Sequence, residues 1–324
     1  HAVDVHSVPE QSSHRNLKPE SHMAQHRHLI ATASLDRDWV EQDLFAATDR
    51  LRSEQASEPV MQGKVLYCLF YEPSFLTRTS FERAAGLLGG SAYHTEDASQ
   101  FFPAHTPGYI DNIINILASL RIDLVVLRSG DPGVVEQAEA ADTVAVINGG
   151  SSDDHPTQAL ADLYTIQGEL GQVDGATVAV VGRLEHRNVN ALLKGLALFD
   201  GVRVILVPFS GQVSESVMEH CFERGLNLET RRDIEAVAEA DVIYLNGPRT
   251  AAHAQLLRSR NSGNLRIDEQ FMSMLKPGCA IMDPMQRSGD FSIEVQDDRL
   301  AFYRQAENAL YVRMAVIQHT IGLA

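Results

Sequence analysis

His155 and Gln158 are the two side chains in this sequence that are best placed to do chemistry. They stand in His155-Pro156-Thr157-Gln158, directly after a loop of glycine, serine and aspartate. Pro156 favours a helix start, because a missing N–H costs nothing there. Residues three apart at a helix N-terminus point the same way, and the helix dipole there favours an oxygen anion. The pair can therefore donate hydrogen bonds to a carbonyl group. A capped helix with a structural histidine is the alternative for such a segment taken alone.

Strand-like and helical segments alternate along the chain. Apolar runs rich in β-branched residues predict strands at Lys64–Phe70, Ser91–His94, Leu124–Arg128, Val144–Asn148, Val178–Gly182, Val202–Pro208, Asp241–Asn246 and Cys279–Asp283. Their lack of alternation is typical of strands buried on both faces of a parallel sheet. Helical patterns lie between them, at Trp39–Ser53, Ser80–Leu88, Tyr109–Leu120, Gln158–Leu170 and Val189–Leu198. This order predicts an α/β protein with two doubly wound parallel-sheet domains linked by helices.

Three segments stand apart from this pattern. Residues 168–175 are rich in glycine and interrupt a helix, so the chain divides there. Residues 1–28 hold six of the thirteen histidines and no apolar period, and Ser21-His22-Met23 resembles a cloning scar. We expect residues 1–28 to be a disordered or tag-derived extension, with a histidine-rich metal-binding tail as the alternative. The apolar helix at about Ala309–Ile321 cannot be assigned to either domain by chain order alone.

Composition excludes several classes of partner. The formal net charge of −16 repels nucleic acid and anionic membranes, so an anionic substrate needs a local basic pocket. No apolar run approaches the roughly 18 residues that span a bilayer. The three cysteines, Cys68, Cys221 and Cys279, are widely spaced, which indicates no disulfide framework or metal site and fits a reducing cytoplasm. We expect a small-molecule substrate, with no metal and no cofactor.

A dinucleotide site is the one cofactor site that the sequence suggests locally. The strand Val178–Gly182 ends in glycine, as in nicotinamide-binding folds. The G-x-G-x-x-G pattern that would bring a pyrophosphate close to the backbone is missing, since Gly182 is the only glycine of the three. Nicotinamide binding is therefore not predicted.

The segment from His155 to Thr165 resembles the H-P-T-Q-x-L-x-D-L-x-T element of aspartate carbamoyltransferases, in the aspartate/ornithine carbamoyltransferase family. That element grips the carbamoyl group of carbamoyl phosphate. The resemblance runs from about Leu29 to the C-terminus, through matches at Glu72–Glu82, Val125–Arg128, Val178–Arg187 and Gln305–Ala315. It implies a carbamoyl-phosphate-type domain at 29–167 that includes a C-terminal helix at 309–324. It further implies an amino-acid-binding domain at 168–308 and a homotrimer with sites at subunit interfaces.

The resemblance implies roles for seven matched side chains. Three of them polarise the carbamoyl group in the family: Arg128, His155 and Gln158. Ser74 and Thr77 match two hydroxyl groups that donate to the phosphate. Arg187 matches the cation that holds the amino acid's carboxylate, and Glu72 matches an acidic residue that pairs across the domains on closure. The implied reaction needs no protein base. A bound amine attacks the polarised carbamoyl carbon and phosphate leaves, so the protein supplies positioning and charge stabilisation.

The phosphate loop departs from the family pattern. When Ser74 and Ser80-Phe81-Glu82 are aligned, the family's Thr-Arg pair falls on Phe75 and Leu76. The lost arginine normally bonds the departing phosphate, and such a bond to a charged group is worth about 1.5–3 kcal/mol. In a shifted alignment Arg78 would take the arginine's place, at the expense of the better-matched flanks.

Other cations of the family are also replaced. The lysine of a loop that a neighbouring subunit inserts falls on Pro107, with His105 as the nearest ionisable group. The arginine that recognises aspartate's side chain falls on Gly247, two residues before Arg249. Asp283-Pro284-Met285-Gln286-Arg287 stands where the family has H-P-L-P-R, and the loop at 182–187 is one residue shorter.

Three hypotheses follow. The first is an enzyme with an altered substrate or altered chemistry, in specialised metabolism, which keeps the carbonyl-binding and carboxylate-binding contacts. The second is an active aspartate carbamoyltransferase, in which Arg78, Arg249 or His105 substitutes for the lost cations. The third is a non-catalytic homologue that serves a structural or regulatory role beside an active partner chain.

Overall fold

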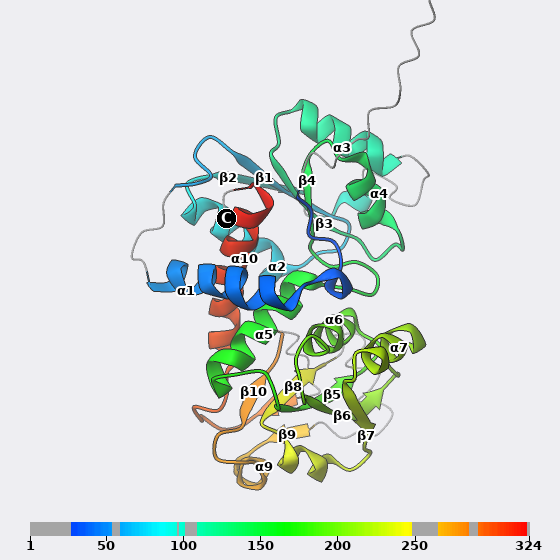
Figure 1. Ribbon diagram of the computed structural model, residues 1–324, viewed down its shortest axis with the longest axis vertical. Helices are drawn as coiled ribbons and strands as arrows, with labels where there is room; N and C mark the ends of the chain where they lie inside the picture. Colours follow the sequence, from blue (N-terminus) through cyan, green and yellow to red (C-terminus); the bar gives the residue numbers. More distant parts are fainter. Residues whose placement is uncertain are drawn as a thin grey trace, which may run out of the picture.

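The computed structural model describes residues 27–53, 59–95, 97–100, 109–247, 265–284 and 291–322. The predictions for residues 1–26, for the segment from Phe101 to Pro107, for Arg249 and for residues 285–287 lie outside these ranges. The described chain forms two sheet-containing halves that stack along the long axis of the molecule (Figure 1).

The first half is built on a four-stranded parallel sheet with the order β2-β1-β3-β4. The strands are β1 (Val65–Phe70), β2 (Ser91–Thr95), β3 (Leu124–Arg128) and β4 (Ala145–Asn148). One face is covered by α3 (Tyr109–Ser119) and α4 (Val134–Ala141), and the other by α2 (Phe75–Leu87). Neighbouring strand residues point to opposite faces, so Val125 and Val126 lie in different apolar clusters.

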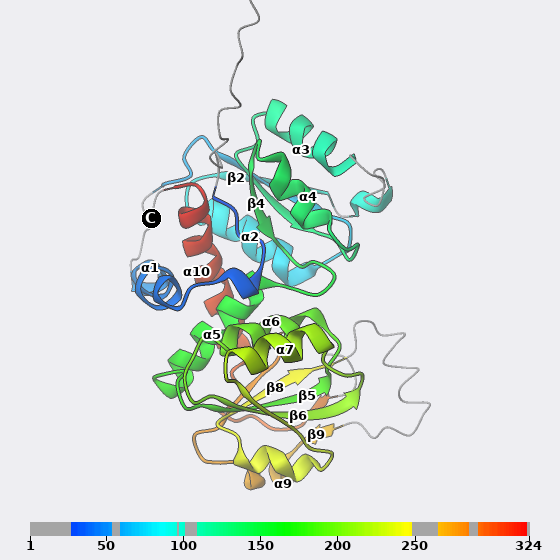
Figure 2. The ribbon, with the colours of Figure 1, turned by 45° about the vertical axis from the view of Figure 1, so that its right-hand side comes forward.

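The second half contains a five-stranded parallel sheet with the order β10-β8-β5-β6-β7. Its strands are β5 (Thr177–Arg183), β6 (Arg203–Ser210), β7 (Asn227–Thr230), β8 (Val242–Asn246) and β10 (Ala280–Met282). Helices α6 (Arg187–Leu196) and α7 (Glu215–Glu223) lie on one side and α9 (Glu269–Met274) on the other (Figure 2). Strands β9 (Leu265–Ile267) and β11 (Phe291–Ile293) form a small separate pair. The predicted α/β class with two parallel-sheet halves is confirmed.

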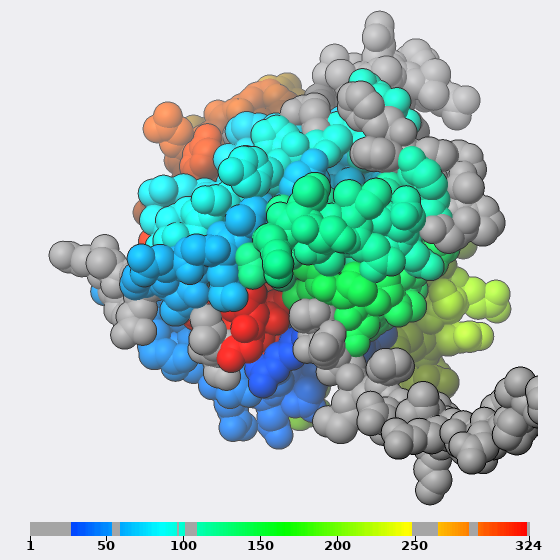
Figure 3. Space-filling model, turned by 90° about the horizontal axis from the view of Figure 1, so that it is seen from above, coloured from blue at the N-terminus to red at the C-terminus, as the bar shows by residue number. Residues whose placement is uncertain are grey.

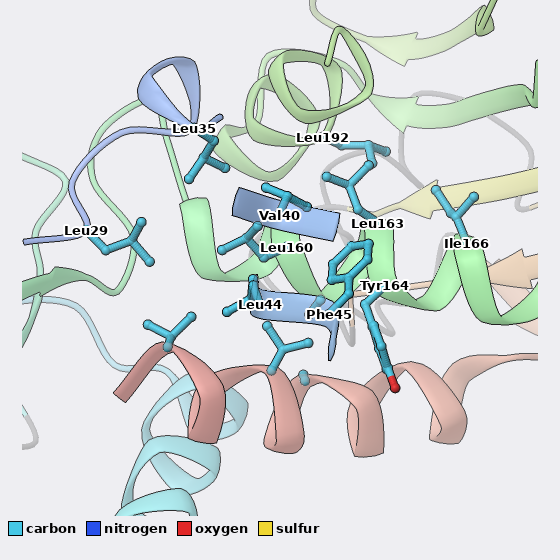
Figure 4. Close-up of a cluster of buried hydrophobic side chains, with 14 of the residues drawn as sticks. Leu29, Leu35, Val40, Leu44, Phe45, Leu160, Leu163, Tyr164, Ile166 and Leu192 are labelled. Atoms are coloured by element: carbon cyan, nitrogen blue, oxygen red, sulfur yellow. The ribbon is translucent and has the colours of Figure 1, made fainter. Parts of the chain in front are cut away.

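Two helices join the halves. Helix α5 (Pro156–Leu170) lies between the sheets, and α10 (Phe302–Thr320) packs against α5, α2 and α1 (Ala46–Ser53). One hydrophobic cluster includes the inner faces of both sheets and these helices. Figure 4 shows part of it, where Phe45 packs edge-on against Tyr164 of α5 with ring centroids 5.3 Å apart. The two sheets therefore share a continuous core.

Several element boundaries differ from the predicted ones. Helix α2 begins at Phe75 rather than Ser80, because Ser74 is extended and ends the preceding loop. The helix predicted at 39–53 begins with a π-helical turn, Trp39–Phe45, before α1. Helix α10 begins at Phe302 rather than Ala309, and its last residues reach the surface beside the N-terminal segment (Figure 3). Within the described residues, no helix combines the length and apolar character that a membrane span requires.

Gly182 lies where a side chain would clash with the neighbouring strand. It has φ +122° at the end of β5, and a Cβ there would lie 2.2 Å from the backbone oxygen of Asn246. Gly182→Ala should therefore lower the free energy of unfolding by about 2 kcal/mol or more. Gly168→Ala is the matched control, since its Cβ would meet nothing within 4 Å inside α5. Urea unfolding of both variants measures the difference, and equal midpoints would contradict the account.

Candidate active site

The predicted site residues lie where parallel sheets place ligand sites. In the first sheet β2 lies on one side of β1, and the chain then returns to place β3 on the other side of β1. The strand order therefore reverses between β1 and β3. Ligands bind at such switch points, beyond the carboxyl ends of the strands. Glu72 follows β1, and Arg128 ends β3 opposite Phe70. The second sheet has its switch point between β5 and β8, and Arg187 follows β5.

A cavity of about 510 Å³ joins these two edges. Six of the predicted site residues line it: Glu72, Ser74, Thr77, Arg128, His155 and Gln158. Phe75, Leu76 and Pro284 contribute apolar surface, and Tyr71, His186 and Asn188 contribute further polar groups. The structure therefore brings most of the predicted residues to one place.

Arg128 is the guanidinium that lines this cavity among the described residues. It is 9% exposed, and its Nη1 donates to the backbone oxygen of Gly149 at 3.0 Å. Gly150 leaves room for it, because a Cβ at that residue (φ +123°) would lie 2.7 Å from Nη1 of Arg128. The Gly149-Gly150 turn thus holds the guanidinium in one orientation, which is the preorganisation that charge stabilisation in a transition state requires.

Glu72 connects the two halves of the site. Its Oε2 accepts a hydrogen bond from Nη2 of Arg187 and lies 3.9 Å from Nε of Arg128. Arg187 is 4% exposed and also donates to the backbone oxygen of Ser151. One carboxylate therefore stands between two cations that a substrate anion would also attract. Arg187 is not part of the cavity lining, but its partner Glu72 is.

His155 is a neutral hydrogen-bonding group in this site. It is 3% exposed, and burial, together with the charges of Arg128, Arg313 and Arg187, lowers its pKa well below 6.5. Its Nε2 lies 3.4 Å from Oγ1 of Thr77, and its Nδ1 has no hydrogen-bond partner among the described residues. A neutral imidazole carries one N–H and one acceptor nitrogen. The ring can therefore donate to a carbonyl oxygen without carrying charge.

The remaining predicted residues are placed differently. Arg78 lies in the first turns of α2 and is absent from the described cavity lining, whereas Leu76 is part of it. Gly247 is buried after β8. His186 and Asn188 were not predicted, although they are the sequence neighbours of Arg187: His186 lies in the loop at 182–187 and Asn188 in the first turn of α6. His186 is positioned by its own helix, since its Nδ1 accepts from the backbone N–H of Asn188 at 3.2 Å. Groups of ligands suited to a metal ion are absent from the described residues.

Family comparisons match almost the whole described chain. Residues 27–168 match the aspartate/ornithine carbamoyltransferase carbamoyl-P binding domain, and residues 174–320 match the Asp/Orn binding domain of the same family. The chain belongs to the aspartate/ornithine carbamoyltransferase family. The predicted resemblance is thereby confirmed. The first matched segment contains the switch point between β1 and β3, and the second contains the switch point between β5 and β8.

Individual members of the aspartate/ornithine carbamoyltransferase family show the same extent of similarity. The chloroplastic aspartate carbamoyltransferase of Arabidopsis thaliana is 31% identical over 90% of this chain and 76% of its own length. The catalytic subunit from Thermococcus gammatolerans is 31% identical over 89% and 96%.

Solved structures of the family agree. Trypanosoma cruzi aspartate transcarbamoylase in complex with carbamoyl phosphate and aspartate has a TM-score of 0.79 and 27% identity, covering 91% of this chain and 95% of that one. The ornithine carbamoyltransferase from Pyrococcus furiosus has a TM-score of 0.81 and 26% identity, covering 91% and 97%.

The neutral state of His155 predicts a pH effect on stability. Below pH 6.5 the unfolded chain binds a proton at His155 that the folded chain does not, so unfolding becomes easier as the pH falls. One such group contributes at most about 1.4 kcal/mol per pH unit. The free energy of unfolding of His155→Gln should therefore fall less steeply between pH 6.5 and 5 than that of the unaltered chain. Urea unfolding at several pH values tests this, and parallel curves would contradict it.

Proposed function

We propose that this chain is an enzyme that transfers a carbamoyl group to the amine of an amino acid, with an altered leaving-group end in its cavity. The observation that carries the proposal is the convergence of three donors on one buried wall: the Arg128 guanidinium, the neutral His155 ring and the Thr77 hydroxyl. The aspartate carbamoyltransferases among its relatives support the transfer reaction. They favour the hypothesis of an active enzyme over that of entirely new chemistry.

The chemistry follows from these donors. Hydrogen bonds from Arg128 and His155 draw electrons toward the carbonyl oxygen of the donor, so the carbamoyl carbon becomes more electrophilic. The unprotonated amine of the acceptor attacks it, a C–N bond forms, and the bond from that carbon to the leaving group breaks. The proton that the amine loses goes to the leaving group or to solvent. The protein contributes orientation and charge stabilisation.

Arg187 is the proposed contact for the acceptor's carboxylate. Its guanidinium pairs with Glu72, so a bound carboxylate would share or replace that partner. Arg187 follows β5 and Glu72 follows β1, hence this exchange would involve both walls of the cavity. His186 and Asn188, the sequence neighbours of Arg187, line the cavity and are further candidate contacts for the acceptor.

The leaving-group end is where we expect this enzyme to differ. Ser74, Leu76 and Thr77 line the cavity at the start of α2. In the alignment that matches Ser74 and Ser80-Phe81-Glu82, the family's arginine falls on Leu76. Phe75, which is 80% exposed, adds a second apolar side chain there. The charge of Arg128 is partly balanced by Glu72. A phosphate dianion would therefore find fewer cationic contacts among the described residues, and we expect carbamoyl phosphate to bind weakly.

We also propose that the chain assembles as a homotrimer with its sites at the subunit interfaces. The family resemblance supports this, and so does the exposure of Phe75 at the cavity, which a neighbouring chain would cover. Light scattering coupled to size-exclusion chromatography measures the mass directly. A monomer would contradict the assembly without affecting the proposed reaction.

Arg128→Met tests the proposed reaction. Removing a preorganised charged donor should lower kcat/KM for carbamoyl transfer about 10²–10³-fold, because the charge on the carbonyl oxygen grows in the transition state. The assay uses labelled carbamoyl phosphate with L-aspartate and a panel of other amino acids. Arg83→Met is the matched control, since Arg83 is exposed on α2. If the unaltered chain neither turns over nor binds these compounds, the hypothesis of a non-catalytic homologue replaces this one.

Leu76→Arg tests the altered leaving-group end. A restored charge-assisted bond is worth about 1.5–3 kcal/mol, so carbamoyl phosphate should bind about 10–100-fold more tightly. Calorimetric titration gives the dissociation constant for the unaltered chain, Leu76→Arg and the apolar control Leu76→Met. Unchanged affinity in Leu76→Arg would show that Leu76 does not face the leaving group.

A further inference from the structure

Asp162 is a fully buried carboxyl group on α5, one helical turn after Gln158. Its Oδ1 accepts hydrogen bonds from Nε2 of Gln158 and Nε2 of Gln305, both at 2.8 Å, and its Oδ2 accepts from the hydroxyl of Tyr244 at 2.8 Å. Burial raises the pKa of Asp162 to about 6, so the carboxyl group is ionised at pH 8. An ionised carboxylate can only accept, which fixes all three partners as donors.

This contact determines which way the Gln158 amide faces. With Nε2 turned toward Asp162, the amide oxygen lies at the other end of the group. Nη2 of Arg313 donates to that oxygen at 3.4 Å, and an arginine can only donate. Asp162 and Arg313 therefore both stabilise the same orientation of the Gln158 amide. A carbonyl oxygen has two lone pairs, so Oε1 of Gln158 retains acceptor capacity in the cavity that Gln158 lines.

Arg313 is itself held in place from the phosphate-loop side. It is fully buried, its Nη1 donates to Oγ of Ser80 at 2.6 Å, and its guanidinium lies 5.3 Å from the centre of the Phe81 ring. Oγ of Ser80 is in turn within 2.7 Å of the backbone oxygen of Leu76. The orientation of Gln158 is thus connected to the first turn of α2.

Asp162 is connected to the opposite wall as well. Tyr244 lies on β8 of the second sheet, and Oε1 of Gln305 accepts from the backbone N–H of Asp283 at 2.9 Å. Pro284, the next residue, lines the cavity. A single carboxylate therefore joins α5 to both walls of the site.

We propose that Asp162 is a positioning residue, which holds the Gln158 amide with its oxygen toward the ligand and so selects a ligand that carries an N–H donor at that point. The NH2 of a carbamoyl group meets this requirement, whereas the methyl of an acetyl group does not. The inference rests on the proposed function, because it assumes that the cavity binds the carbamoyl group. It adds the residue that lets the site distinguish a carbamoyl compound from an acyl compound of the same shape.

N-carbamoyl-L-aspartate and N-acetyl-L-aspartate are suitable probes, since they differ in NH2 against CH3. Calorimetric titration at pH 8 gives the ratio of their dissociation constants. We expect the unaltered chain to prefer the carbamoyl compound, because a site built for a hydrogen bond rejects an analogue that lacks it. Asp162→Ala should reduce the ratio about tenfold, since only the long contact from Arg313, at 3.4 Å, then orients the amide of Gln158.

Two further variants separate positioning from a general structural role. Asp162→Asn should restore the ratio, because Oδ1 of asparagine can accept from Gln158 while its Nδ2 donates to the Tyr244 oxygen. Tyr244→Phe is the matched control. It removes a hydrogen bond of similar length from the same carboxylate but leaves the contact with Gln158, so the ratio should stay unchanged.

If Asp162→Ala does not fold, the double variant Asp162→Leu with Tyr244→Phe replaces it, because fewer buried donors are left without a partner. An unchanged ratio of dissociation constants in whichever Asp162 variant folds would overturn the inference but not the proposed function. An equal reduction of the ratio in Tyr244→Phe alone would do the same. Binding of neither probe by the unaltered chain would overturn the proposed function, and the inference with it.

Discussion

The burial of helix α5 between two sheets is the constraint on which the rest of the structure depends. Its residues from Pro156 to Ile166 are all buried, so it packs on every side rather than along one stripe. Apolar residues such as Leu160 and Leu163 join the shared core, as Figure 4 shows. The polar residues of α5 are shielded from water, and a buried polar group without a hydrogen-bond partner destabilises the fold. Each must therefore find its partner on a neighbouring element.

The polar residues of α5 consequently connect the site to the fold. Thr165 accepts from Asn308 of α10 at 3.0 Å, as Asp162 accepts from Gln305 and Tyr244. The N-terminal end of the same helix presents His155 and Gln158 to the cavity. Burial keeps His155 neutral. Burial also raises the pKa of Asp162, but its hydrogen bonds and the charge of Arg313 oppose that rise, so Asp162 stays ionised at pH 8. The helix thus supplies both the binding groups and the scaffold that orients them, which explains why its start is the most informative segment of the sequence.

The alternation of strand-like and helical segments predicted the fold class for physical reasons, and the helix start at Pro156 predicted His155 and Gln158 as binding groups. The other predicted residues of the cavity lining came from the family resemblance. Strands such as Leu124–Arg128 are continuous apolar runs, which is typical of strands buried on both faces of a parallel sheet. Arg128 and Glu72 were predicted from the family resemblance. Arg313, Tyr244 and Gln305 could not be predicted as one cluster, because each lies on a different element from Asp162 or far along the chain from it. Local propensity carries no information about such contacts.

The central claim is that the wall formed by Arg128, His155 and Thr77 binds a carbonyl group between the two sheets. A crystal structure of the chain with bound N-carbamoyl-L-aspartate tests it most directly. We expect the ureido carbonyl oxygen to lie within hydrogen-bonding distance of Arg128 and His155, with a carboxylate of the ligand at Arg187. A ligand bound elsewhere, or turned so that its carbonyl faces away from Arg128 and His155, would contradict it.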